Sequence, residues 1–212
     1  MSEESPANRK AHWEQVFLAK KSSEVSWYQP RLEMSLALLQ LTGVATDGAI
    51  IDVGGGISTL VDDLLDAGFT DVTVLDIAAP AIHGVRERLG ERAENVSWIE
   101  ADVREVELPG ARFDVWHDRA VFHFLTRKES RERYAATMKS ALKPGGHAIV
   151  ATFGPGAPPR CSGLDVVRYS PENLLAELGP GLRMVHGARE LHLTPSGNEQ
   201  EFTYTCLQKV SD

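Results

Sequence analysis

Short apolar runs alternate with longer amphipathic segments through the middle of the chain. The apolar runs end in small or acidic residues and fall at 49–55, 71–77, 95–103, 113–118 and 147–153. Runs of this kind are typical of strands that are buried on both faces of a parallel sheet. Apolar residues at helical spacing fall between them, at 57–68, 79–92 and 127–146. The alternation predicts an α/β domain built from βαβ units with right-handed crossovers.

The two ends of the chain break this rhythm. Residues 11–43 read as one or two helices, with Pro30 near a start and Gly43 at a stop. After the fifth strand comes a Pro/Gly-rich loop at 154–169, then a short helix with Ser170 as its N-cap. Residues 183–195 and 200–210 read as a hairpin. We therefore expect a helical lead-in at 1–43 and an α/β domain at 44–212 that ends in antiparallel strands.

The first predicted strand runs into the stretch "DVGGGIS". It supplies Asp52, Gly54, Gly55, Gly56 and Ser58. Glycines at a strand-to-helix turn let a ligand approach the backbone, and the N–H groups of the helix N-terminus remain free to bind it. The stretch lacks the dinucleotide pattern GxGxxG, because Thr59 stands where the third glycine belongs. A tight turn without a ligand is the alternative.

Acidic residues end the next two strands. Asp76 follows Gly54 by 22 residues, the offset at which doubly wound folds place an acid in reach of a ribose diol. Asp102 ends the third strand, where an acid can accept from the exocyclic amine of adenine. Parallel strands end at one edge of their sheet, so we expect Asp52, Asp76 and Asp102 to converge on one crevice.

Composition narrows the function classes. Hydrophobic residues make up 42% of the chain and charged residues 25%, an ordinary globular mixture, and the net charge of −8 argues against binding to nucleic acid. Two cysteines without a CxxC pair give no zinc motif, and we expect no metal. The start has no apolar run of signal-peptide length, and no stretch is apolar for 18 residues. We expect a cytoplasmic protein without a membrane partner.

These motifs together resemble the class I S-adenosylmethionine-dependent methyltransferases. The resemblance runs through "IIDVGGGIS", "VTVLDI", "WIEADV", "FDVWHD" and "LKPGGHAIVATF" to the terminal hairpin. Upstream, "HWEQVF" and "SWYQP" look like the lead-in of a subgroup that includes lysine methyltransferases acting on citrate synthase and elongation factors. The resemblance implies a Rossmann-like, doubly wound seven-stranded sheet, mostly parallel with an antiparallel C-terminal hairpin, and S-adenosylmethionine as cofactor with S-adenosylhomocysteine as product.

The resemblance also implies roles for individual residues. Asp52 and the turn of Gly54, Gly55 and Gly56 would face the methionine part of the cofactor, and Ser58 and His117 are further candidates for cofactor binding. Asp76, with Ile77 beside it, would bind the ribose, and Asp102 and Val103 would hold the adenine. Trp27 would place an aromatic face near the sulfonium, where cation–π attraction contributes about 0.5–2 kcal/mol. Core packing is the alternative for Trp27.

The stretch "VWHDRAVFHFL" carries the candidates for proton transfer. Asp118 is the first candidate base or anion near the sulfonium, and His117 and His123 are rivals because an imidazole titrates nearer neutral pH. Satisfied core residues are the alternative. The stretch has "HDRA" where related enzymes that methylate amino groups often carry (D/N)PPY, which removes that indication of an amide or nucleobase acceptor.

Four residues are candidates for contact with the acceptor: Tyr28, Cys161, Arg168 and Tyr169. From these observations we expect methyl transfer by in-line displacement to a small molecule or a protein side chain, in a monomer or homodimer. A catalytically inert cofactor-binding partner protein is the main alternative. A nicotinamide-dependent oxidoreductase is a third, disfavoured by the incomplete GxGxxG pattern.

Overall fold

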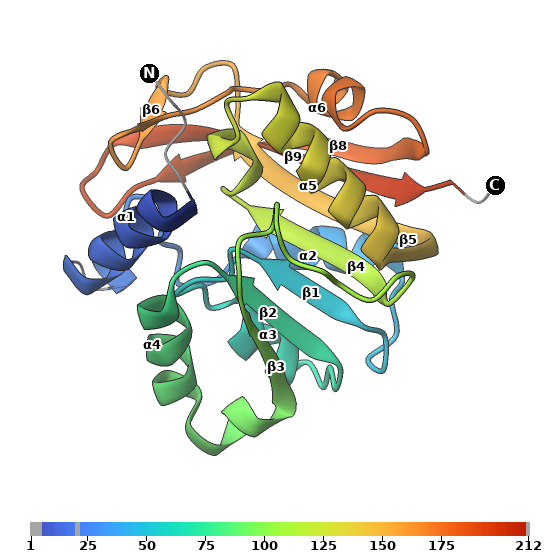
Figure 1. The fold of residues 1–212 in the computed structure, drawn as a ribbon, viewed down its shortest axis with the longest axis horizontal. Helices are drawn as coiled ribbons and strands as arrows, with labels where there is room; N and C mark the ends of the chain where they lie inside the picture. The colour runs from blue at the N-terminus through green and yellow to red at the C-terminus, as the bar shows by residue number, and fades with distance from the viewer. Residues whose placement is uncertain (1–5, 20–21, 211–212) are drawn as a thin grey trace.

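A seven-stranded sheet forms the middle layer of the protein, with helices on both faces (Figure 1). The computed structural model describes residues 6–19 and 22–210. The strand order is β3-β2-β1-β4-β5-β9-β8. The bounds are β1 (Ile50–Val53), β2 (Val72–Asp76), β3 (Val96–Glu100), β4 (Phe113–Arg119), β5 (Leu142–Phe153), β8 (Leu182–Leu193) and β9 (Glu199–Lys209). Strands β1 to β5 pair in parallel, whereas β9 is antiparallel to β5 and β8. The predicted fold class is confirmed.

The helices divide between two cores because successive strand residues point to opposite faces of the sheet. The helices are α1 (Pro6–Ala19), α2 (Glu33–Thr42), α3 (Leu60–Asp66), α4 (Ala79–Leu89), α5 (Lys128–Ala141) and α6 (Pro171–Leu178). Residues of α2, α3 and α4 share one core with Ile50 and Val115 of the sheet. Residues of α5 and α6 share the other with Ile51 and Trp116. We call these the first and the second face of the sheet.

The boundary between α5 and β5 lies earlier than the sequence predicts. The expected helix at 127–146 ends at Ala141, and β5 begins at Leu142 instead of near His147. Pro144 has no N–H to donate within a helix, and Gly145 takes a φ of +76°, so the chain leaves the helix before this segment. The register between β4 and β5 shifts between Phe113 and Val115, which accommodates the irregular start of the strand.

The long loop after β5 is partly ordered into a small hairpin of its own. Strands β6 (Arg160–Cys161) and β7 (Leu164–Asp165) pair within it. The following helix α6 begins as predicted, since the backbone N–H of Asn173 donates to Ser170 Oγ at 3.2 Å. The hairpin predicted near residue 195 joins β8 and β9.

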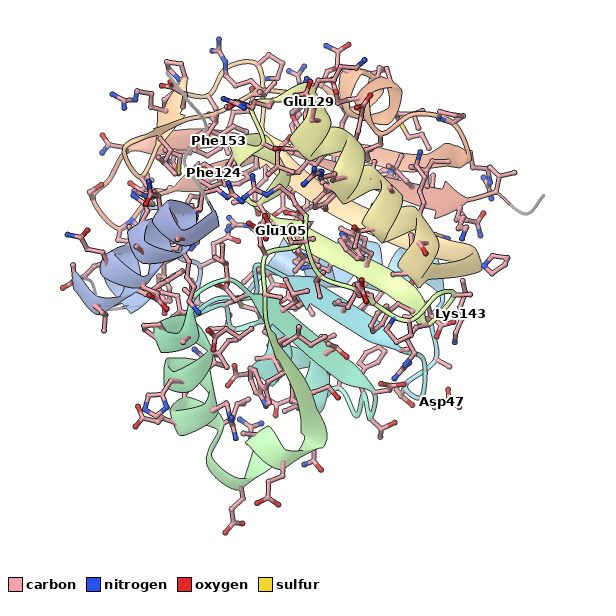
Figure 2. All side chains as sticks on the ribbon, in the orientation of Figure 1. Asp47, Glu105, Phe124, Glu129, Lys143 and Phe153 are labelled. Atoms are coloured by element: carbon pink, nitrogen blue, oxygen red, sulfur yellow. The ribbon has the colours of Figure 1, made fainter. Side chains whose placement is uncertain are left out.

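Helix α1 lies beside the carboxyl ends of β1 to β4, as the ribbon shows (Figure 1). Asp47 and Lys143 lie at the opposite edge of the sheet, far from α1 (Figure 2). Within the described part of the chain, no helix combines the length and the apolar character needed to cross a membrane.

The carboxyl edge of the sheet, next to α1, is the usual ligand site of such sheets, so we expect the functional site there.

Candidate functional site

Two adjoining cavities lie at the carboxyl edge of the sheet. The apolar cavity is walled by the rings of Trp13, Phe17, Trp27 and Phe124 and by residues that end β2 and β3. The glycine-turn cavity is lined by residues 54–58 with Tyr28, Asp52 and His117. Phe17, Trp27, Gly54 and Arg119 line both cavities, so the two form one continuous site.

All the residues expected to bind the cofactor meet at this site. The apolar cavity brings together Asp76, Ile77, Asp102 and Val103. The glycine-turn cavity brings together Asp52, Gly54, Gly55, Gly56, Ser58 and His117, and Trp27 borders both cavities. Residues spread over some ninety positions of the chain thus converge, although their binding roles stay predictions.

The turn after β1 requires glycine for reasons of backbone shape and of space. Gly54 has a φ of +65°, and a Cβ on it would lie 2.0 Å from Val121 Cγ2. Gly56 has a φ of +46°, and a Cβ there would lie 3.2 Å from Asp76 Oδ2 and 3.4 Å from the ring of Phe17. Positive φ is costly for residues with a side chain. Side chains at Gly54 and Gly56 would therefore be strained and crowded, and glycine leaves the backbone of the turn accessible at these two positions.

Asp52 and His117 form a buried hydrogen-bonded chain with Ser35 of α2. His117 Nδ1 donates to Asp52 Oδ1 at 2.7 Å, and Nε2 lies 2.9 Å from Ser35 Oγ, which donates to it when the ring is neutral. All three side chains are buried. The other carboxylate oxygen of Asp52, Oδ2, is buried and has no hydrogen-bond partner within residues 6–19 and 22–210. A buried acceptor without a donor is costly, so the free oxygen suits a ligand that brings an N–H group.

Asp76 is buried at the end of β2 and faces the apolar cavity. Burial raises the pKa of its carboxyl to about 7, against the opposing effect of hydrogen bonds from nearby backbone N–H groups. One of these, from Ala78, reaches Oδ1 at 2.8 Å. The carboxylate has lone pairs left to accept hydroxyl groups, as binding of a ribose requires.

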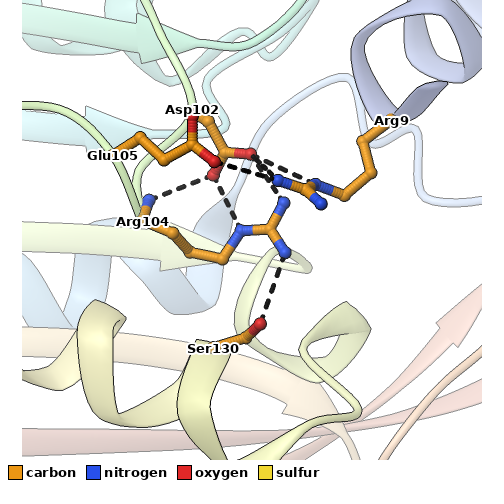
Figure 3. A network of polar contacts seen from close by, with 5 residues as sticks. All are labelled: Arg9, Asp102, Arg104, Glu105 and Ser130. Atoms are coloured by element: carbon orange, nitrogen blue, oxygen red, sulfur yellow. Dashed lines mark hydrogen bonds and ion pairs between the residues drawn. The ribbon is translucent and has the colours of Figure 1, made fainter. Parts of the chain in front are cut away.

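Asp102 is already engaged by two arginine side chains (Figure 3). Arg104 donates to it through Nε at 2.8 Å and Nη2 at 2.6 Å, and Arg9 of α1 donates through Nη2 at 3.0 Å. Arg9 also reaches Glu105 at 3.3 Å. Asp102 therefore lines the cavity as expected, but its carboxylate holds α1 in place instead of standing free for an adenine amine.

Aromatic rings of α1 cover the apolar cavity. Trp13 contacts Phe124 edge-on with ring centres 4.9 Å apart, and it contacts Trp27 in the same way at 6.0 Å. Phe17 contacts Trp27 edge-on at 6.3 Å. The side chain of Phe124 lies next to α1 (Figure 2). We call Trp13, Phe17, Trp27 and Phe124 the aromatic roof of the site.

Asp118 lies outside both cavities, contrary to its expected role as a base. Its Oδ1 accepts from the N–H of Val121 at 2.9 Å, and its Oδ2 accepts from the N–H of Phe122 at 3.1 Å and from the hydroxyl of Tyr134 at 2.6 Å. Burial raises the pKa of this carboxyl to about 6. The strand alternation turns Asp118 toward the second face, where it fastens the turn after β4.

His123 is also displaced from the site. It is fully buried between Phe124 and Phe153, and the N–H of Phe153 donates to its Nδ1 at 3.0 Å. Burial lowers the pKa of this imidazole to about 3. His117 lines the glycine-turn cavity, but both of its ring nitrogens are occupied. None of the three residues expected to transfer protons offers a free basic atom to the site.

The four candidates for acceptor contact separate in the structure. Tyr28 lines the glycine-turn cavity. Arg168 instead braces the loop after β5, donating to the carbonyls of Pro155 and Ala157, and Tyr169 is buried against Phe122. Cys161 is a buried thiol of the first core. Cys161, Arg168 and Tyr169 line neither cavity.

Arg119, which ends β4, lies at the site as its place at the strand end suggests, although the sequence assigns it no role in binding or catalysis. Its side chain borders both cavities. The signal for such a role is the two-residue period of a strand: Arg119 must share a face with His117, and Asp118 must face the other way. Among the described residues, no group of three or more histidine, cysteine or acidic side chains is arranged to hold a metal ion.

The sequence matches the methyltransferase-domain family over residues 50–146. Over 144 residues it is 26% identical to the eEF1A lysine and N-terminal methyltransferase of Mus musculus, covering 65% of this chain and 20% of that protein. It is 32% identical over 119 residues to the ubiquinone/menaquinone biosynthesis C-methyltransferase of Azotobacter vinelandii, covering 54% and 46%. The chain thus spans about a fifth and about half of these relatives, respectively.

Solved methyltransferase structures share the fold over nearly the whole chain. The 1,6-didemethyltoxoflavin-N1-methyltransferase of Burkholderia thailandensis, solved with S-adenosylhomocysteine, superposes with a TM-score of 0.74 at 18% identity, covering 100% of this chain and 93% of that one. The N-methyltransferase NodS of Bradyrhizobium japonicum, also solved with S-adenosylhomocysteine, gives 0.71 at 16% identity, covering 94% and 100%.

These matches support the family and the class of cofactor that the sequence leads us to expect. The matched segment contains the glycine turn, Asp76 and Asp102, which are the residues that first suggested this family. We conclude that residues 50–146 match a methyltransferase domain, and that the protein shares the fold of S-adenosylmethionine-dependent methyltransferases.

Proposed function

We propose that this protein transfers a methyl group from S-adenosylmethionine to a small-molecule acceptor. The observation that carries the proposal is the pair of buried acids on either side of the glycine turn. Asp52 offers an oxygen without a partner, suited to the ammonium of the methionine part, and Asp76 faces the apolar cavity, suited to the ribose hydroxyls. The aromatic roof gives the adenine apolar surroundings.

The residues at the site supply alignment rather than proton transfer. S-adenosylmethionine brings a methyl group on a sulfonium, which is a good leaving group. An electron pair of the acceptor forms the new bond to the methyl carbon, the carbon–sulfur pair leaves with sulfur, and any acceptor proton passes to solvent. Holding the reactants in line contributes about 7–11 kcal/mol to such a reaction. The basic atoms of His117, Asp118 and His123 already take part in hydrogen bonds within the protein, which fits a reaction without a protein base.

An acceptor of small size fits the enclosed site better than a protein side chain. Helix α1 lies beside the carboxyl ends of the strands and its Trp13 and Phe17 line the apolar cavity, so a protein substrate would have to be accommodated next to this helix. The quinone C-methyltransferase relatives are named for small-molecule chemistry, whereas the eEF1A relative is named for lysine and N-terminal methylation. The cytoplasmic location and the monomeric or dimeric state stay predictions.

Calorimetry with S-adenosylmethionine, S-adenosylhomocysteine and NAD tests the choice of cofactor. We expect both sulfur compounds to bind and NAD to bind weakly; preference for NAD would reject the proposal. Labelled methyl transfer to a cell extract, separated afterwards into protein and small molecules, tests activity and the class of acceptor. Cofactor binding without any labelled product would favour the inert partner protein.

Asp76→Asn tests the ribose site directly. The amide keeps the shape of the carboxyl but loses one acceptor and its charge, so we expect about tenfold weaker binding of S-adenosylhomocysteine. The wild-type affinity is expected to rise between pH 6 and pH 8, because burial raises the pKa of Asp76 to about 7 and the ionised form accepts both hydroxyls. This rise should vanish in Asp76→Asn and persist in Asp66→Asn, a change at an exposed aspartate of α3.

A further inference from the structure

The guanidinium of Arg119 is a buried charge that the proposed cofactor contacts do not use. Its side chain lines both cavities, yet the residue is only 9% exposed. Taking a charge out of water costs several kcal/mol unless other groups compensate it. The neighbours of Arg119 therefore show what this charge is for.

Two of the guanidinium nitrogens have neutral partners. Nη1 donates to the carbonyl of Trp27 at 2.7 Å, and Nε donates to the hydroxyl of Tyr204 at 2.9 Å. The ring of Phe202 lies 4.5 Å from the guanidinium carbon. These contacts fix the plane of the group without neutralising it.

The third nitrogen, Nη2, has no hydrogen-bond partner among the described residues. The nearest carboxylate oxygen, Glu190 Oε2, is 3.9 Å away, beyond hydrogen-bonding distance. That oxygen already accepts the hydroxyl of Tyr204 at 3.1 Å. The positive charge of Arg119 is therefore only partly compensated, and one of its donors is unused.

The position of the guanidinium assigns it to the acceptor rather than to the cofactor. Its contacts Tyr204, Phe202 and Glu190 belong to β8 and β9. The acids proposed for the cofactor end β1 and β2, on the other side of β4 in the sheet order. In an in-line displacement the acceptor lies on the far side of the methyl group from sulfur. With the cofactor held by the acids of β1 and β2, Arg119 borders the part of the site that is left for the acceptor.

We propose that Arg119 determines acceptor specificity and selects an anionic small molecule, whose carboxylate or similar oxyanion binds Nη2. This inference rests on the proposed methyltransferase function. An anion would complete the hydrogen bonding of the guanidinium and balance two positive charges, that of Arg119 and that of the sulfonium. A protonated amine, such as a lysine side chain, would meet both charges unfavourably.

The test measures binding of three probes of similar shape and different charge. Benzoate, benzamide and benzylamine are titrated into the protein saturated with S-adenosylhomocysteine, with tryptophan fluorescence as readout because Trp13 and Trp27 line the site. We expect benzoate to bind most tightly of the three probes. Its affinity should fall by about tenfold or more in Arg119→Gln, and by less in Arg119→Lys, which keeps the positive charge. Arg168→Gln, at a loop arginine outside both cavities, should leave benzoate binding unchanged.

Failure of this inference can be told apart from failure of the proposed function. Arg119→Gln should bind S-adenosylhomocysteine within about threefold of wild type, which also shows that the variant is folded. If the variant loses S-adenosylhomocysteine but keeps 5′-methylthioadenosine, Arg119 holds the cofactor carboxylate and the inference is wrong. A complex that binds S-adenosylhomocysteine but shows no Arg119-dependent preference for benzoate also overturns it. A wild-type protein that binds neither cofactor compound rejects the proposed function itself.

Discussion

Three consecutive residues at the end of β4 have different roles, because successive side chains of a strand point to opposite faces of the sheet. His117 and Arg119 face the cavities, where one supports Asp52 and the other borders the acceptor side. Asp118 faces the second core and holds the turn that follows. Reading the two-residue period along this strand predicts the division, whereas reading residue chemistry alone selects Asp118 as a base.

At this scale, Asp118→Asn should reduce stability rather than catalysis. An amide offers one acceptor oxygen, and its NH₂ group would face a donor: either the N–H of Val121, or both the N–H of Phe122 and the hydroxyl of Tyr134. We expect the free energy of unfolding in urea to fall by about 1–3 kcal/mol, with cofactor affinity retained. Asp47→Asn, at an exposed loop position, is the matched control. Lost methyl transfer at unchanged stability would restore Asp118 as a base.

His123 should make the protein sensitive to acid. Its pKa is about 3 in the folded state and near 6.5 in the unfolded chain, so between these values only the unfolded chain takes up the proton. Stability is therefore lost as the pH falls below 6.5. His123→Asn keeps an acceptor for the N–H of Phe153 and removes this titration. Between pH 7.5 and pH 4.5 the wild type should lose about 2–3 kcal/mol more than the variant; equal losses would contradict the assignment.

At the scale of elements, the lead-in helix is attached to the edge of the sheet by charge as well as by aromatic contacts. Arg9 binds Asp102 and Glu105, and Lys10 pairs with Glu100 of β3. Trp13 and Phe17 of the aromatic roof belong to the same helix as these two basic residues. Docking of α1 therefore depends on Asp102, which the sequence assigns to the cofactor alone.

Arg9→Gln should loosen this docking without unfolding the domain. Because α1 covers the cavities, we expect S-adenosylhomocysteine to dissociate about 3–10 times faster, with a smaller change in its association rate. Stopped-flow fluorescence of the roof tryptophans measures both rates. Arg92→Gln removes an exposed arginine that pairs with Asp66 of α3 and serves as the control. An unchanged dissociation rate would show that the aromatic contacts alone hold the helix.

For the molecule as a whole, the sequence predicts the fold and one half of the site. Glycine turns and strand-end acids are local signals, so β1, β2 and β3 and their cofactor residues could be assigned from spacing. The acceptor half depends on contacts such as Arg119 with Tyr204, which are 85 positions apart and meet only because β9 inserts between β5 and β8. Likewise, no spacing in the sequence indicates that Arg9 reaches Asp102, 93 positions away.

The position of α1 over the cavities has a kinetic consequence. Under the proposed function, exchange of spent for fresh cofactor takes place next to this helix, and we expect it to be faster when the helix moves aside. We therefore expect the ion pairs and rings that hold α1 to influence the rate of repeated turnover. In such a protein, substitutions of charged surface residues can change the turnover rate without altering the geometry of the reacting atoms.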